Sequence, residues 1–127
     1  MKKSVTIVIA VLVLIVGVFA FTTQSAKSPE PVANIEVSAA NTINYGDNGF
    51  EPSSLTVKSG TTILVKNNSA KALQFRSNEH PSHTENQELN MGALNPGKSD
   101  TFTANKIGNY GYHNHLNPND NGTLVIQ

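Results

Sequence analysis

The four histidines of this 127-residue chain lie in two close pairs. His80 and His83 form one pair, and His113 and His115 form the other. The chain contains no cysteine. Neutral imidazole nitrogens suit copper, zinc and nickel, so paired histidines are how such a chain can bind a transition metal. The pairs therefore indicate a candidate metal site; the alternative is that all four are solvated surface side chains.

Other kinds of active site leave no comparable pattern in the sequence. We find no paired carboxylates, no set of Ser, His and Asp arranged for nucleophilic attack and no phosphate-binding loop. Three histidines with an open metal position could still activate water or oxygen, which keeps an enzyme or redox protein as a third reading. We predict a binding protein rather than an enzyme.

The second histidine pair lies in a β-prone segment. Alternate residues of a strand point to the same side of the sheet, so His113 and His115 share one face with Gly111. Tyr110 and Tyr112 then share the opposite, inward face. We expect these two imidazoles on the outer surface of a sheet.

The first histidine pair lies in residues 77–91, which are polar, poor in strand signals and long for a loop. To bring His80 and His83 to the second pair, this loop has to fold across the outer face of the sheet. Gly111 has no side chain and would leave room for such an approach. Possible additional ligands are Glu79, Glu85 and Met91.

The remaining chain beyond residue 34 reads as short β-prone runs separated by turn residues, with no helical stripe of useful length. We expect strands at residues 35–37, 43–45, 55–57, 61–66, 72–76, 99–103, 108–113 and 122–126. About seven short strands with this spacing are typical of an all-β, Greek-key β-sandwich.

The N-terminus reads as a targeting segment. Lys2 and Lys3 precede an apolar run over residues 5–21, which predicts an N-terminal hydrophobic helix. Residues 1–21 are either a cleaved signal peptide or a membrane anchor. Residues 22–33 form a flexible spacer, and residues 34–127 form one domain. We expect this domain outside the cytoplasm, in the periplasm or on the outer face of the cell membrane, secreted or tethered through residues 5–21.

The charge balance bears on possible partners. The whole chain carries nine basic and nine acidic residues, and without Lys2 and Lys3 the net charge becomes about −2. A nucleic-acid partner would require a basic surface, so we exclude it. Without cysteine, no disulfide stabilises the domain, and its stability has to come from the core and from any bound metal.

Several landmarks resemble the cupredoxins of the plastocyanin and azurin type, which are small exported β-sandwiches that bind copper. The landmarks cover most of residues 45–127, and their order and spacing match the family. They are residues 50–52 (FEP), 55–60 (LTVKSG), 65–67 (VKN), 94–99 (LNPGKS), 108–112 (GNYGY) and 122–126 (GTLVI). The resemblance implies the cupredoxin fold.

The resemblance does not extend to the blue-copper ligands of the family. The positions that it assigns to the usual His, Cys, His and Met hold Leu73, Asn114, Asn117 and Asp120. Without a thiolate an ordinary blue copper centre cannot form. The chain thus resembles a thiol-free branch of the family.

Together, these observations predict an exported copper-binding protein with a histidine-only, non-blue site made by His113, His115, His80 and His83. Cu(II) is favoured because copper leads the divalent affinity order with nitrogen ligands, and zinc is the competing ion. Its role would be copper handling or electron transfer, with a copper donor or acceptor protein as partner. The alternative is a metal-free β-sandwich that serves as a binding or assembly module of the cell envelope.

Overall fold

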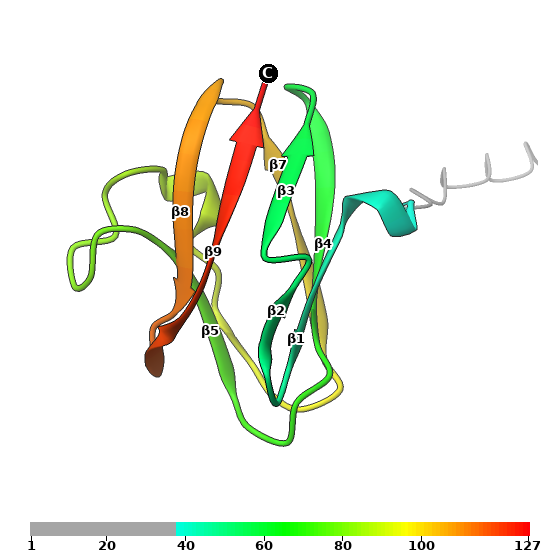
Figure 1. Cartoon of the computed structure of the whole chain (residues 1–127), viewed down its shortest axis with the longest axis vertical. Helices are drawn as coiled ribbons and strands as arrows, with labels where there is room; N and C mark the ends of the chain where they lie inside the picture. Colours follow the sequence, from blue (N-terminus) through cyan, green and yellow to red (C-terminus); the bar gives the residue numbers. More distant parts are fainter. Residues whose placement is uncertain (1–37) are drawn as a thin grey trace, which may run out of the picture. The chain divides into compact units, whose positions relative to one another are not determined.

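The structure, a computed structural model, describes residues 38–127, which fold into two β-sheets (Figure 1). One sheet has the strand order β2-β1-β4-β7, and the other has the order β3-β9-β8-β5-β6. The strands of the first are β1 (Thr42–Gly46), β2 (Gly49–Glu51), β4 (Thr61–Asn67) and β7 (Ser99–Ala104). Those of the second are β3 (Ser54–Val57), β5 (Leu73–Ser77), β6 (Ala93–Leu94), β8 (Gly108–Asn114) and β9 (Asn117–Ile126). The expected all-β Greek-key sandwich is confirmed.

The strands form because apolar residues alternate along them. In β4, Ile63 and Val65 are fully buried while Leu64 between them is partly exposed, and this period of two places one side of the strand in the core. Aromatic rings fill the space between the sheets. The ring of Tyr112 lies 4.8 Å from that of Phe75 and 5.1 Å from that of Phe50. The inward face of β8 is therefore firmly anchored.

Two short 3-10 helices, η1 (Ala39–Asn41) and η2 (Gln87–Leu89), complete the described elements. The loop that contains η2 leaves the end of β5 and projects beside β8 (Figure 1). It returns where the backbone N–H of Met91 donates to the carbonyl of Phe75 at 3.0 Å. Residues 78–90 therefore form an excursion from β5, which we call the histidine loop.

The largest difference from the expected boundaries lies at the last strand, and β2 and β6 were not among the expected strands. The last strand begins at Asn117 rather than at Gly122, and Asn117 already pairs with Asn114 across the β8–β9 hairpin. The side-chain oxygen of Asn114 accepts a hydrogen bond from the N–H of Leu116 at 3.1 Å. This local bond closes the turn over two residues.

The predicted segments 1–21 and 22–33 and the expected strand at 35–37 lie outside the described residues. Within residues 38–127, no helix has the length and apolar character needed to cross a membrane.

Candidate metal centre

The histidine loop is attached to β8 at Gly111. The backbone N–H of Asn78 donates to the carbonyl of Gly111 at 2.9 Å, and the N–H of Gly111 donates to Oε2 of Glu85 at 2.8 Å. These bonds continue the pairing of β5 with β8 beyond the last residue of β5, Ser77. The loop therefore lies on the outer face of the sheet, beside the second histidine pair.

Within the loop, several hydrogen bonds hold the backbone of His83. Its carbonyl accepts from Oγ of Ser77 at 3.0 Å and from Nδ2 of Asn90 at 2.8 Å. Its φ of 53° lies in the left-handed region, which non-glycine residues seldom occupy. The surrounding bonds thus hold His83 in an unusual conformation that directs its ring toward β8.

The other pair comes from β8 and the turn that follows it. His113 lies on the face opposite Tyr112, as the alternation of a strand requires, and the histidine loop covers it so fully that it is 2% exposed. His115 lies just beyond the strand, where its N–H donates to the carbonyl of Gln74 at 2.8 Å. His113 thus lies at the buried bottom of the site, and His115 lies nearer the surface.

The structure brings all four predicted histidines together. The ring of His83 lies 5.0 Å from that of His113 and 4.8 Å from that of His115. The ring of His80, an exposed residue, lies 4.9 Å from that of His115 and 5.6 Å from those of His83 and His113. One ring nitrogen each of His83, His113 and His115 lies within 4.8 Å of the others. These three form the inner group of the site.

The hydrogen bonds of the rings assign their free nitrogens. Nδ1 of His83 lies 2.9 Å from the carbonyl oxygen of Ser77, which can only accept, so this nitrogen holds the proton. Nδ1 of His113 lies 3.0 Å from Oδ1 of Asn78, and by the same reasoning it donates. In the neutral rings, Nε2 of both histidines therefore presents a lone pair. Nε2 of His113 is buried and has no hydrogen-bond partner.

The distances and the unpartnered atom are consistent with a bound metal ion. Two imidazole nitrogens on one ion lie about 2.9 Å apart at a right angle and about 3.3 Å apart at a tetrahedral angle, for metal–nitrogen bonds of about 2.0–2.1 Å. Nε2 of His83 lies 2.9 Å from Nδ1 of His115. Together with these two nitrogens, the buried Nε2 of His113 gives the group three candidate nitrogen donors.

The electrostatics of the site favour neutral rings. Burial, followed by the proximity of His83, His80 and His115, lowers the pKa of His113 to about 4. Desolvation, followed by the proximity of His83, His80 and Arg76, also lowers the pKa of His115. Only a neutral imidazole offers a nitrogen lone pair to a metal, so both lowered pKa values favour the charge state of the ring that binding requires.

The three possible additional ligands, Met91, Glu85 and Glu79, do not belong to the inner group of histidines. Met91 is buried in the core, and Glu85 accepts the N–H of Gly111. Glu79 is exposed and lies outside the inner group. The contacts of Asn78 with His113 and of the Ser77 carbonyl with His83 have no local sequence signal, because each depends on where the loop crosses the strand.

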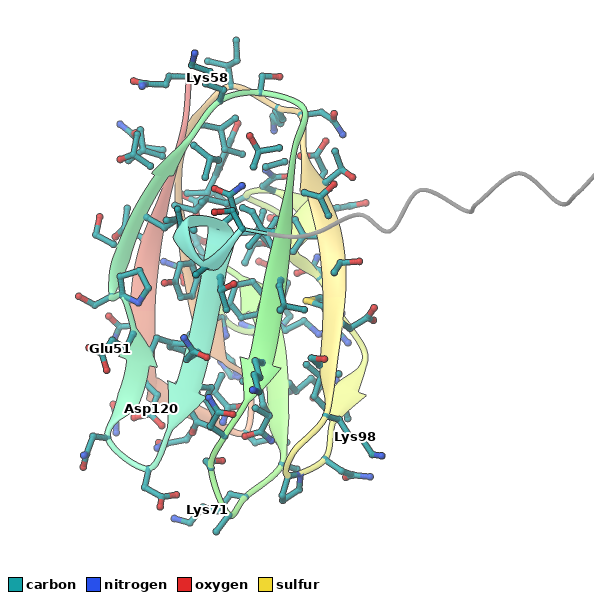
Figure 2. The ribbon with its side chains drawn as sticks, turned by 90° about the vertical axis from the view of Figure 1, so that its right-hand side faces the viewer. Glu51, Lys58, Lys71, Lys98 and Asp120 are labelled. Atoms are coloured by element: carbon teal, nitrogen blue, oxygen red, sulfur yellow. The ribbon has the colours of Figure 1, made fainter. Side chains whose placement is uncertain are left out.

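At the four positions that the resemblance assigns to the blue-copper ligands, side chains pack and bond to one another. Leu73 is fully buried. Nδ2 of Asn114 donates to the hydroxyl of Tyr45 at 2.9 Å, and this hydroxyl donates to Oδ2 of Asp120 at 2.6 Å. Asn117 donates to the same Oδ2 at 2.9 Å. Asp120 lies toward the end of the sandwich that holds Lys71, far from Lys58 (Figure 2).

Comparisons with known proteins agree with the fold. The family model described as cupredoxin-like domain matches residues 10–126. A purple cupredoxin from Nitrosopumilus maritimus is 19% identical, with a TM-score of 0.60 over 68% of this chain and 98% of that chain. A mutant of amicyanin in its Cu(I) form is 21% identical, with a TM-score of 0.55 over 71% of this chain and 84% of that chain.

A third similar structure is larger. The copper-containing nitrite reductase from Thermus scotoductus SA-01 is 20% identical, with a TM-score of 0.57 over 68% of this chain and 22% of that chain. No curated protein matches the sequence. At these identities the structures show a shared fold, while the family model extends over most of the chain. This protein therefore belongs to the family of cupredoxin-like domains.

Proposed function

We propose that this protein binds copper through imidazoles alone, at a site on the outer face of the β3-β9-β8-β5-β6 sheet. His83, His113 and His115 are the resident ligands, and His80 is the fourth, exposed ligand. The observation that carries the proposal is Nε2 of His113, which is buried among the other imidazoles without a partner. A buried polar atom without a partner is rare in a folded protein, and a metal ion is a partner that this donor set suits.

The chemistry of the ligands favours copper. Imidazole nitrogens bind Cu(II) more strongly than they bind the other common divalent ions, and zinc is the chief competitor. The described residues provide no thiolate at the site, since the chain has no cysteine. A bound copper ion would supply a cation that can cycle between Cu(I) and Cu(II). The protein holds and orients it with neutral rings, His113 being kept neutral by burial.

We further propose that the domain spans residues 34–127 and works outside the cytoplasm, following a signal peptide or membrane anchor at residues 1–21 and a spacer at residues 22–33. The apolar run of residues 5–21 behind two lysines supports this location. The role that fits best is copper handling, with a copper donor or acceptor protein as partner. Electron transfer is the second role and catalysis is not proposed.

A second candidate function is a metal-free binding or assembly module of the cell envelope. The observation that favours it is the bonded network of Asn114, Tyr45 and Asp120, which occupies the place of the lost copper ligands. That network satisfies the side chains at the positions of the usual blue-copper ligands without a metal ion. It leaves the buried lone pair of His113 unexplained, so copper binding remains our conclusion.

Calorimetric titration of the purified, metal-free, full-length chain with Cu(II) and with Zn(II) tests the proposal. We expect one ion per chain, with binding abolished or strongly weakened in a double variant with His113→Ala and His115→Ala. The matched control is Asn117→Ala, which alters the vacated position and should leave affinity unchanged. Circular dichroism checks that both variants fold.

Two outcomes would overturn copper binding at this site. One is an affinity no greater than that of an unstructured peptide containing histidines, and the other is an unchanged affinity in the double variant. The copper complex should be pale, because its absorption comes from weak d–d transitions. An intense blue band of the thiolate kind would contradict the histidine-only assignment.

A further inference from the structure

We propose that Asn78 is a positioning residue of this site: its side-chain oxygen holds the proton on Nδ1 of His113 and thereby reserves Nε2 for the ion. The inference rests on the proposed function and adds to it a residue that does not itself touch the metal. Hydrogen-bond partners of metal-binding histidines commonly fix the ring tautomer and orientation.

The contact between the two side chains is direct. Oδ1 of Asn78 lies 3.0 Å from Nδ1 of His113. With the proton on Nδ1, the bond is satisfied and Nε2 presents its lone pair to the cluster. With the proton on Nε2, two acceptors would face each other at 3.0 Å, and a buried N–H would lack an acceptor. With the Asn78 amide in this orientation, the Nδ1–H tautomer of His113 is favoured.

The fold holds Asn78 in place from three directions. Its N–H donates to the carbonyl of Gly111 at 2.9 Å, and its own carbonyl accepts from the N–H of Glu85 at 2.9 Å. Its side chain lies directly over Gly111, where a Cβ would come 2.0 Å from Nδ2. Gly111 precedes His113 by two residues on the same face of β8. The missing side chain thus lets Asn78 reach the ring beside it.

Asn78 is distinctive among the residues of the described domain, 38–127. Apart from the imidazoles themselves, its side chain alone is hydrogen-bonded to an imidazole nitrogen. The corresponding partner of His83 is the backbone carbonyl of Ser77, which substitution cannot remove. The orienting bond of His113 can therefore be tested by mutagenesis, whereas that of His83 cannot.

The first test is nitrogen-15 NMR of the imidazoles in the metal-free, full-length chain near neutral pH. We expect His113 in the Nδ1–H form, with an unprotonated Nε2. A His113 ring in the Nε2–H form would overturn the inference without any substitution. This measurement does not depend on metal binding, so it separates the inference from the proposed function.

The second test compares three variants by the same NMR measurement and by Cu(II) titration. Asn78→Ala should lose the tautomer preference and bind Cu(II) about 10- to 100-fold more weakly. Asn78→Asp keeps an acceptor oxygen and should restore the Nδ1–H form. The matched control is Gln87→Ala, which removes an exposed amide of the same loop that contacts no imidazole nitrogen. It should keep the His113 tautomer.

The outcomes are distinguishable. Wild-type chain that binds Cu(II), with the same His113 tautomer and affinity in Asn78→Ala, overturns this inference and leaves the proposed function intact. Wild-type chain that fails to bind Cu(II) overturns both. If Asn78→Ala does not fold, the wild-type tautomer and Asn78→Asp decide the question: an Asp variant with an Nε2–H ring on His113 would contradict the orienting role.

Discussion

Nε2 of His83 lies 2.9 Å from Nδ1 of His115, although 32 residues separate the two histidines along the chain. Because the carbonyl of Ser77 keeps the proton of His83 on Nδ1, the nitrogen that faces His115 is an acceptor. In the metal-free protein, with both rings neutral, Nδ1–H of His115 therefore donates across this gap. His83 and His115 could together hold a metal ion only after that proton has left Nδ1 of His115.

The two histidines of the loop should contribute unequally to copper affinity. His83 belongs to the inner group, whereas His80 is exposed and lies outside it. We expect His83→Ala to weaken Cu(II) binding by more than about 100-fold and His80→Ala by less than about tenfold, the latter corresponding to about 1.4 kcal/mol. Competition titrations against a chelator of known affinity measure both. Equal losses would indicate a site with four equivalent ligands.

The stability of the metal-free protein should decrease in acid. Burial lowers the pKa of His113 from 6.5 to about 4. Between these pH values the unfolded chain binds a proton at this residue and the folded chain does not. The contribution of His113 to the free energy of unfolding is fully present above pH 6.5 and is lost as the pH falls toward 4. The slope from this group is at most about 1.4 kcal/mol per pH unit.

Urea unfolding at several pH values measures this dependence. The lowered pKa of His115 acts in the same direction. The control is His113→Leu, which removes the titrating group and should flatten the profile. An identical slope in His113→Leu would show that other groups cause the acid sensitivity.

Gly111→Ala should separate the loop from the strand. The new Cβ would meet Nδ2 of Asn78 at 2.0 Å, so the Asn78 side chain has to move. We expect a loss of stability of about 1–3 kcal/mol together with weaker Cu(II) binding. The matched control is Gly92→Ala in the following segment, where an added Cβ meets nothing within 4 Å. Thermal unfolding and copper titration of both variants check the prediction, and equal effects would contradict it.

Tyr45→Phe should destabilise the fold without affecting the metal centre. The hydroxyl of Tyr45 donates to Asp120 and accepts from the buried amide of Asn114, which would lose its partner. Such a loss costs about 1–3 kcal/mol. Copper affinity should stay at the wild-type value, because this network lies on the inward side of Asn114 and touches no histidine. A weaker copper affinity in Tyr45→Phe would instead connect the vacated pocket to the site.

The sequence allowed much of the fold to be predicted, because local patterns encode it. Ile63 and Val65 in β4 and Tyr110 and Tyr112 in β8 are buried, as their period of two requires. The predicted start of the last strand, residue 122, was wrong by five residues. The side chain of Asn114 closes a short turn there, and β9 starts early because Asn117 pairs with Asn114 of β8, a pairing that the residue pattern does not show.

By itself, the sequence determined the chemistry of the candidate ligands: four imidazoles, no thiolate, and two of the rings near one face of a strand. Only the tertiary structure decided that the histidine loop crosses this face, that His113 is buried and that Oδ1 of Asn78 lies 3.0 Å from Nδ1 of its ring. The physical reason is distance along the chain. Composition and periodicity act over a few residues, whereas the loop's path depends on hydrogen bonds such as those of Asn78 and Glu85 with Gly111, which exist only after β8 has paired with β5.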